Sequence, residues 1–120
     1  MVIIKMIPSI SRKSQKPQVP DGFRVYAVGD IHGRADLLDG LLDRIGLDLA
    51  KAPVSHSIEV FLGDYVDRGP DSRKVLDRLV ARNHAHQTVF LKGNHEVFLT
   101  EFANNPSMLS DWQRLVVSRR

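Results

Sequence analysis

Residues 62–72 read Leu62-Gly63-Asp64-Tyr65-Val66-Asp67-Arg68-Gly69-Pro70-Asp71-Ser72, directly after a largely apolar run over residues 58–61. The run predicts a buried strand, and the glycines predict a turn at its end. Carboxylates and an arginine crowd into this turn, where a hydrophobic core does not need them. Because carboxylate oxygens bind hard divalent cations and a guanidinium binds phosphate, the segment predicts a metal and phosphate site. A solvated loop with an internal ion pair is the alternative interpretation of this segment alone.

Composition limits the kinds of site that the chain can build. It has 120 residues, enough for one domain, and no cysteine, which excludes disulfides, thiolate ligands and a cysteine nucleophile. A metal must therefore bind oxygen and imidazole. The net charge of +3 comes from the N-terminus, because residues 1–20 hold four basic and no acidic residues and leave −1 for residues 21–120. We therefore expect no nucleic-acid partner.

The N-terminal 20 residues are expected to form a disordered basic leader. Pro8, Pro17 and Pro20 interrupt any helix there, and the segment lacks acidic residues. No apolar run approaches the roughly 20 residues that span a bilayer, and the order of a secretory signal is absent. The sequence therefore predicts no membrane partner and a cytoplasmic location.

Three predicted strands alternate with segments of helical periodicity. The strands cover residues 23–28, 58–62 and 88–91, and apolar residues at helical spacing follow each of them. Asp71 or Ser72 is the expected cap of the second helix, and Pro106 is expected to break the third. The order βαβαβα predicts an α/β fold with a parallel sheet, in which ligands bind beyond the carboxyl ends of the strands.

Each predicted strand ends in a glycine followed by aspartate or asparagine. These pairs are Gly29-Asp30, Gly63-Asp64 and Gly93-Asn94. Because parallel strands present their carboxyl ends at one edge, three separate segments converge there. This convergence favours a functional site over the solvated loop.

The converging side chains suit a site for two divalent metal ions. Two cations about 3.5 to 4 Å apart can clamp a phosphoryl group and activate a water molecule. Asp64, on the middle strand, is the predicted bridging ligand. Asp30 and His32, at i and i+2 of an extended chain, are expected to reach one cation. Asn94 offers a carbonyl oxygen to the second cation.

The remaining polar residues predict acid catalysis and phosphate binding. His95 is the predicted proton donor to the leaving alkoxide, because imidazole titrates near neutral pH. Asp67 is expected to hold that imidazole in the required tautomer, and Arg68 to bind phosphate oxygens. Lys92 is open to two interpretations, a substrate contact or a solvated lysine. The remaining side chains of interest are assigned to the surface (His56, His84, His86) or to packing (Trp112).

The segments 29–33, 63–69 and 93–96 resemble, in order and spacing, the three N-terminal motifs of the calcineurin-like metallophosphoesterases. They resemble most closely the phosphoprotein phosphatase branch, which includes serine/threonine phosphatases and symmetrical dinucleoside tetraphosphate hydrolases. The resemblance spans residues 24–101. It implies a β-sandwich flanked by helices, of which this chain would hold the N-terminal half, with manganese, or alternatively iron or zinc, as the metal.

The resemblance also implies roles for individual residues. Asp30, His32 and Asp64 would hold the first metal, and Asp64 and Asn94 the second. His95 would be the acid. Asp67 would orient it, and Arg68, together with Asn94 and His95, would contact the substrate phosphate.

Two departures from the family pattern bear on function. Lys92 stands where many serine/threonine members have arginine. The family completes its second metal site with two histidines and adds an arginine from a C-terminal half, whereas no histidine follows Glu96 here. Residues 21–120 are thus predicted to be the N-terminal part of a metallophosphoesterase domain, in a longer protein or in a truncated product.

The expected function is that of a metal-dependent phosphatase. Its expected substrate is phosphoserine or phosphothreonine in a protein. The alternatives are hydrolysis of dinucleoside tetraphosphates, which uses the same motifs, and a non-catalytic remnant that binds one metal.

Overall fold

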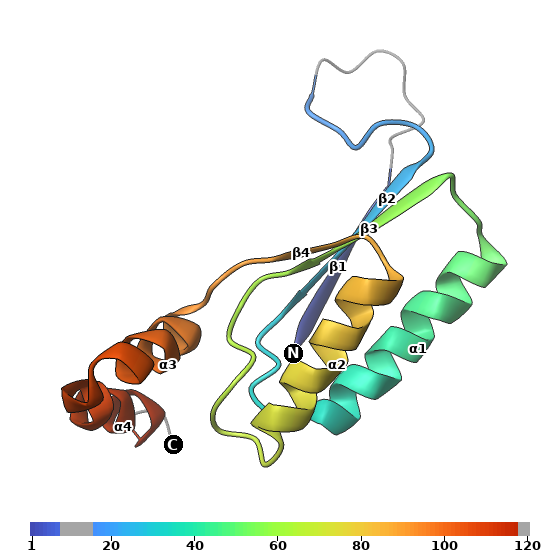
Figure 1. Cartoon of the computed structure of the whole chain (residues 1–120). Helices are drawn as coiled ribbons and strands as arrows, with labels where there is room; N and C mark the ends of the chain where they lie inside the picture. The colour runs from blue at the N-terminus through green and yellow to red at the C-terminus, as the bar shows by residue number, and fades with distance from the viewer. Residues whose placement is uncertain (8–15, 118–120) are drawn as a thin grey trace.

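The structure, a computed structural model, describes residues 1–7 and 16–117. It contains a four-stranded sheet (Figure 1). Its strands are β1 (Val2–Met6), β2 (Phe23–Gly29), β3 (His56–Phe61) and β4 (Thr88–Phe90), and they lie in this order across the sheet. β2, β3 and β4 are parallel, whereas β1 runs antiparallel to β2 at the edge.

Two helices cover one face of this sheet. α1 (Ala35–Lys51) and α2 (Ser72–Ala85) lie side by side on it, and α3 (Asn94–Asn104) and α4 (Leu109–Val117) lie beyond the end of β4 (Figure 1). A short 3₁₀ turn, η1 (Pro106–Met108), connects α3 to α4. The order of β2 to α3 confirms the predicted βαβαβα arrangement and the α/β fold class. In the part of the chain that the structure describes, no helix is long and apolar enough to cross a membrane.

The hydrophobic core lies between the sheet and these two helices. Tyr26, Val28 and Phe61 point from alternate strand positions toward α1 and α2 and are buried. The opposite face of the sheet stays largely open. Apolar side chains of β1 and β4 are 44% to 58% exposed on it (Val2, Ile4, Met6, Val89).

The prediction of a disordered leader is wrong for residues 2–6, which form β1. Lys5 lies opposite Tyr26 in the β1–β2 pair, and its Nζ atom lies 2.6 Å from Asp48 Oδ1 on α1. The sequence contains a short apolar run here, but the strand that pairs with it lies much later in the chain, so local patterns do not predict β1. The predicted disorder of residues 8–15 lies outside the residues that the structure describes.

The helices begin and end close to the predicted residues, but the predicted capping of α2 is not observed. α2 begins after Asp71, yet no side chain caps it, and Ser72 Oγ instead accepts a hydrogen bond of 3.0 Å from the Asp67 amide. α3 ends at Asn104 before Pro106, as predicted. Its first turn contains Asn94 and His95, which the sequence had placed in the segment that closes the strand.

Candidate active site

Three loops meet at the carboxyl ends of the parallel strands. They follow β2, β3 and β4, and backbone hydrogen bonds join the first two. The amides of His32 and Gly33 donate to the carbonyls of Asp64 and Tyr65 at 2.9 and 2.8 Å, and the amide of Gly69 donates to the His32 carbonyl at 2.8 Å. These bonds fix the two loops relative to each other before any ligand binds.

Glycine is required where the loops cross. Gly33 has a φ of +69°, and a Cβ atom there would lie 2.7 Å from the Gly69 carbonyl oxygen. A Cβ atom on Gly93 would collide with the carboxylate of Asp64. Both substitutions would therefore push the predicted ligands apart.

Five non-glycine residues in these loops adopt left-handed backbone conformations. They are Asp30, His32, Asp64, Asp67 and Arg68, with φ between 44° and 71°. Each such conformation costs on the order of 1–2 kcal/mol for an L-residue. The expectation that Asp30 and His32 share one side of an extended chain is therefore wrong, because a turn brings them together instead.

The first three predicted metal ligands do converge. Asp30, His32 and Asp64 each offer an atom, and these atoms lie within 4.8 Å of one another. His32 Nδ1 lies 3.1 Å from the Val66 carbonyl oxygen. A carbonyl only accepts, so Nδ1 carries the proton and Nε2 remains available as a ligand. Two carboxylates and one imidazole fit a divalent cation such as manganese, iron or zinc.

Asn94, the predicted ligand of a second metal, is exposed at the first position of α3. Its neighbour His95 donates its amide to Asp64 Oδ1 at 3.4 Å. The structure therefore places the start of α3 against the predicted bridging carboxylate.

His95 and Asp67 form the predicted pair. His95 is 2% exposed, and its Nδ1 lies 2.8 Å from Asp67 Oδ2. The His95 ring meets that of His32 edge to face, with centroids 4.8 Å apart. The pair therefore lies directly beside the convergent ligands.

Arg68, the predicted phosphate contact, and Lys92, a possible substrate contact, have different surroundings. Arg68 is exposed, and its guanidinium makes no hydrogen bond or ion pair with any residue that the structure describes. Lys92 instead donates to Thr100 Oγ1 on α3 at 3.2 Å. Arg68 is therefore available to an incoming anion, whereas Lys92 already has a partner.

Glu96 is a site residue to which the sequence reasoning gave no role. Its side chain is buried, and Oε1 accepts from the Asp64 and Gly93 amides at 2.6 and 3.0 Å. Oε2 accepts from the Tyr65 amide at 2.9 Å. One carboxylate thus ties the loop after β3 to the start of α3. Its position as the third residue of a helix, three after a glycine, was the available signal.

Trp112 on α4 also reaches the site. Its Nε1 donates to Asp67 Oδ2 at 2.6 Å, while its ring packs against Phe102 with centroids 5.5 Å apart. Packing alone, as the sequence suggested, is an incomplete description. Trp112 and Asp67 are 45 positions apart in the sequence, so local patterns do not reveal the contact.

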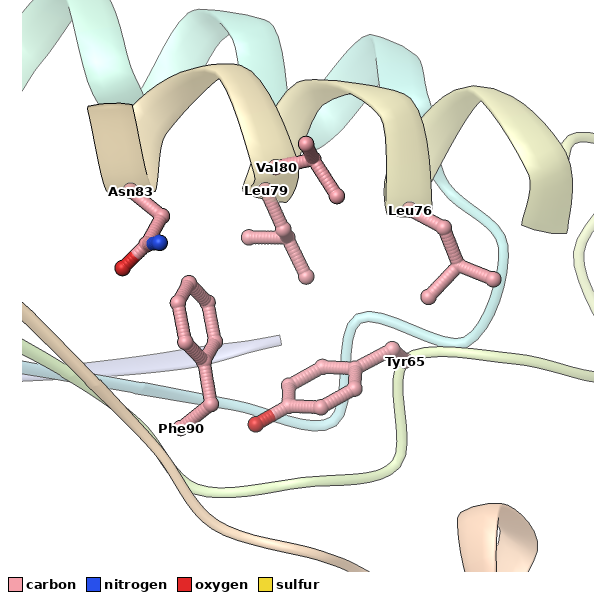
Figure 2. Close-up of a pocket in the computed structure, with 6 residues that line it drawn as sticks. All are labelled: Tyr65, Leu76, Leu79, Val80, Asn83 and Phe90. Carbon is pink, nitrogen blue, oxygen red and sulfur yellow. The ribbon is translucent and has the colours of Figure 1, made fainter. Parts of the chain in front are cut away.

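A separate apolar cavity of about 290 Å³ lies between α2 and the rings of Tyr65 and Phe90, where Figure 2 shows the facing side chains. Its lining contains no metal-ligating carboxylate or histidine. The Tyr65 hydroxyl points to the backbone, 2.6 Å from the Leu91 carbonyl oxygen. Burial, followed by the nearby Glu96 charge, raises the pKa of Tyr65 to about 12. The cavity thus lies within the apolar packing beneath α2 and is not part of the candidate active site.

Comparison with known proteins agrees with the motifs and the geometry. A family model described as calcineurin-like phosphoesterase matches residues 23–118. The chain belongs to the calcineurin-like phosphoesterase family.

The curated proteins that are similar to this chain act on different substrates, according to their names. A zinc-dependent endopolyphosphatase from Saccharomyces cerevisiae is 31% identical over 92% of this chain and 32% of its own length. The serine/threonine-protein phosphatase BSL2 of Arabidopsis thaliana is 37% identical over 57% of the chain and 7% of its own length. A symmetrical bis(5'-nucleosyl)-tetraphosphatase from Ectopseudomonas mendocina is 37% identical over 68% and 27%. The chain thus spans about a third or less of these relatives.

Proposed function

We propose that residues 21–120 form the N-terminal part of a metal-dependent phosphatase that hydrolyses phosphoserine or phosphothreonine in proteins. The observation that carries the proposal is the convergence of Asp30, His32 and Asp64 beside the His95–Asp67 pair. Arg68 follows Asp67 in the chain, is exposed and has no hydrogen-bond or ion-pair partner among the described residues, which supports a phosphate ester as substrate. The proposal includes the cytoplasmic location predicted from the sequence, which cell fractionation would check.

The proposed cofactors are two divalent cations. Asp30, His32 and Asp64 would hold the first, and Asp64 and Asn94 would contribute to the second. When bound, such ions supply Lewis-acid catalysis and an activated water. Manganese is the proposed metal. The donor set also accommodates iron and zinc, so a comparison of rates with each metal tests this choice.

The protein's own groups supply the proton and bind the phosphate. Because His95 Nδ1 faces Asp67, Nε2 is the atom that would pass a proton to the leaving oxygen. The Asp67 carboxylate stabilises the imidazolium before the transfer. Arg68 would bind two phosphate oxygens through its guanidinium fork, with Asn94 as a further substrate contact.

Asp64→Asn tests the metal site with little change of shape. Loss of the central carboxylate charge should lower hydrolysis of an aryl phosphate in added Mn²⁺ by about 100-fold or more. Titration calorimetry should show weaker Mn²⁺ binding. Asp77 is an exposed carboxylate on α2, so Asp77→Asn is the matched control. It should leave the hydrolysis rate and Mn²⁺ binding unchanged. An unaltered rate in Asp64→Asn would refute the assignment.

Dinucleoside tetraphosphate hydrolysis is the second candidate, because an asymmetrical and a symmetrical tetraphosphatase are among the relatives of the chain. Rates on a phosphopeptide, a dinucleoside tetraphosphate and polyphosphate should be compared at equal enzyme and Mn²⁺. We expect the phosphopeptide to be hydrolysed fastest. A preference for the nucleotide would replace the first candidate with the second, and Mn²⁺ binding without hydrolysis would favour a non-catalytic remnant.

A further inference from the structure

One oxygen of Asp67 accepts hydrogen bonds from two helices. Oδ2 lies 2.8 Å from His95 Nδ1 on α3 and 2.6 Å from Trp112 Nε1 on α4. An indole N–H can only donate, so this oxygen carries no proton of its own toward the tryptophan. The indole and the imidazole therefore share one acceptor.

The indole is the other side-chain contact of this carboxylate among the residues that the structure describes. The other hydrogen bonds of Asp67 to described residues involve its backbone. Its amide donates to Ser72 Oγ at 3.0 Å, and its carbonyl accepts from the Gly69 amide at 2.9 Å. These bonds place the main chain but leave the carboxylate free to rotate. Trp112 and His95 together fix its orientation.

A neutral donor has a different effect from a cation at this position. A lysine or arginine on Asp67 would offset the negative charge that attracts the His95 proton. An indole N–H orients the carboxylate and leaves its charge in place. The contact between Trp112 and Phe102 holds the indole on the same unit, α3 and α4, that carries His95.

We propose that Trp112 is a positioning residue for the acid pair, holding Asp67 in the orientation that aligns His95. The catalytic consequence of this proposal rests on the proposed phosphatase function. The contact itself does not depend on that function, and it can be tested separately.

Trp112→Phe removes the N–H donor and keeps a ring to pack against Phe102. In the protein with Mn²⁺ and an aryl phosphate, we expect kcat to fall about 10-fold, with KM changed less than about two-fold. Phe102→Leu, the matched control, removes the ring contact and keeps the N–H, so its kcat should fall less. The opposite order, or an unchanged kcat in Trp112→Phe, would overturn the proposal.

The indole proton gives a readout that needs no catalysis. Trp112 is the single tryptophan of the chain, so one indole N–H resonance reports on it. Asp67→Ala should move this resonance upfield and speed its exchange with water, and Asp67→Asn should do so to a smaller extent. Asp111→Ala, one residue from Trp112 and paired with Arg114, should leave it unchanged.

The indole resonance and the hydrolysis rate distinguish a failure of the positioning proposal from a failure of the proposed function. A resonance that is the same in the wild type and in both Asp67 variants would overturn the positioning proposal. A wild-type protein that hydrolyses no phosphate ester would overturn the proposed function, and the resonance would still decide whether Trp112 holds Asp67.

Discussion

Arg68 combines an exposed guanidinium with an unfavourable backbone. Its φ of 69° lies in the region that glycine tolerates and L-residues avoid. Strain of this kind persists where the surrounding structure imposes it, and it concentrates at functional sites. At Arg68 the loop keeps a strained residue whose side chain has no structural partner among the described residues. A role toward a ligand accounts for both features.

Arg68→Gly should therefore make the protein more stable and weaken its binding of phosphate. Relief of the left-handed strain should raise the free energy of unfolding by about 1 kcal/mol, as measured by urea denaturation. Loss of the guanidinium should raise KM for an aryl phosphate and weaken inhibition by inorganic phosphate. Arg68→Ala removes the same charge but keeps the Cβ atom, so it should share the kinetic defect without the gain in stability. Equal stability of the two variants would contradict the strain argument.

Tyr65 links burial to the pH dependence of stability. Its pKa is about 12 in the folded protein and near 10.0 when unfolded. The folded state thus holds the proton more tightly, and this stabilisation is complete below pH 10 and lost as the pH rises toward 12. The loss should amount to roughly 2 kcal/mol. Tyr65→Phe should lower stability at neutral pH and show a shallower decline between pH 10 and 12. Parallel curves from urea denaturation would contradict this.

At the level of the elements, Glu96 connects two segments that are far apart in the chain, the loop after β3 and the start of α3. It accepts amides from the loop after β3 and from Gly93 before α3. Glu96→Gln turns an NH₂ group toward at least one of these donors. The variant should lose about 2 kcal/mol of stability and bind Mn²⁺ more weakly, because Asp64 loses its anchor. Glu101 is exposed on the same helix, so Glu101→Gln is the control. It should change neither the stability measured by urea denaturation nor the Mn²⁺ affinity measured by calorimetry.

The elements show why sequence predicted some features and not others. β3 and its loop were predictable because the apolar run, the glycines and the charged residues are contiguous. β1 was not, because it depends on pairing with a strand much later in the chain, from Met6 with Val25 to Val2 with Gly29. The convergence of Asp30 and His32 was predicted for the wrong reason, since left-handed turns bring them together. Contacts such as Trp112 to Asp67 require tertiary packing that no local pattern encodes.

Across the molecule, the open face of the sheet is the largest feature from which we predict behaviour in solution. Ile4 and Met6 are 51% and 47% exposed there, next to Val25 and Ala27 of β2. Contiguous exposed apolar surface of this kind promotes association. We therefore expect the 120-residue chain to self-associate at micromolar concentrations.

Substitution on that face should reduce the association. Ile4→Thr with Met6→Thr keeps strand propensity while removing apolar area, so analytical ultracentrifugation should show a larger monomer fraction. Leu47→Gln, a 71% exposed side chain on α1, is the control and should not change the distribution. A monodisperse, cooperatively unfolding wild-type monomer would contradict the expectation.

The antiparallel course of β1 has a practical consequence for purification. Val2 pairs with Gly29, the residue before Asp30, so the beginning of this strand lies at the rim of the candidate metal centre. A polyhistidine tag fused ahead of Val2 would bring additional imidazoles within reach of the same ions. Metal titrations are therefore better made on material whose affinity tag has been cleaved or moved elsewhere.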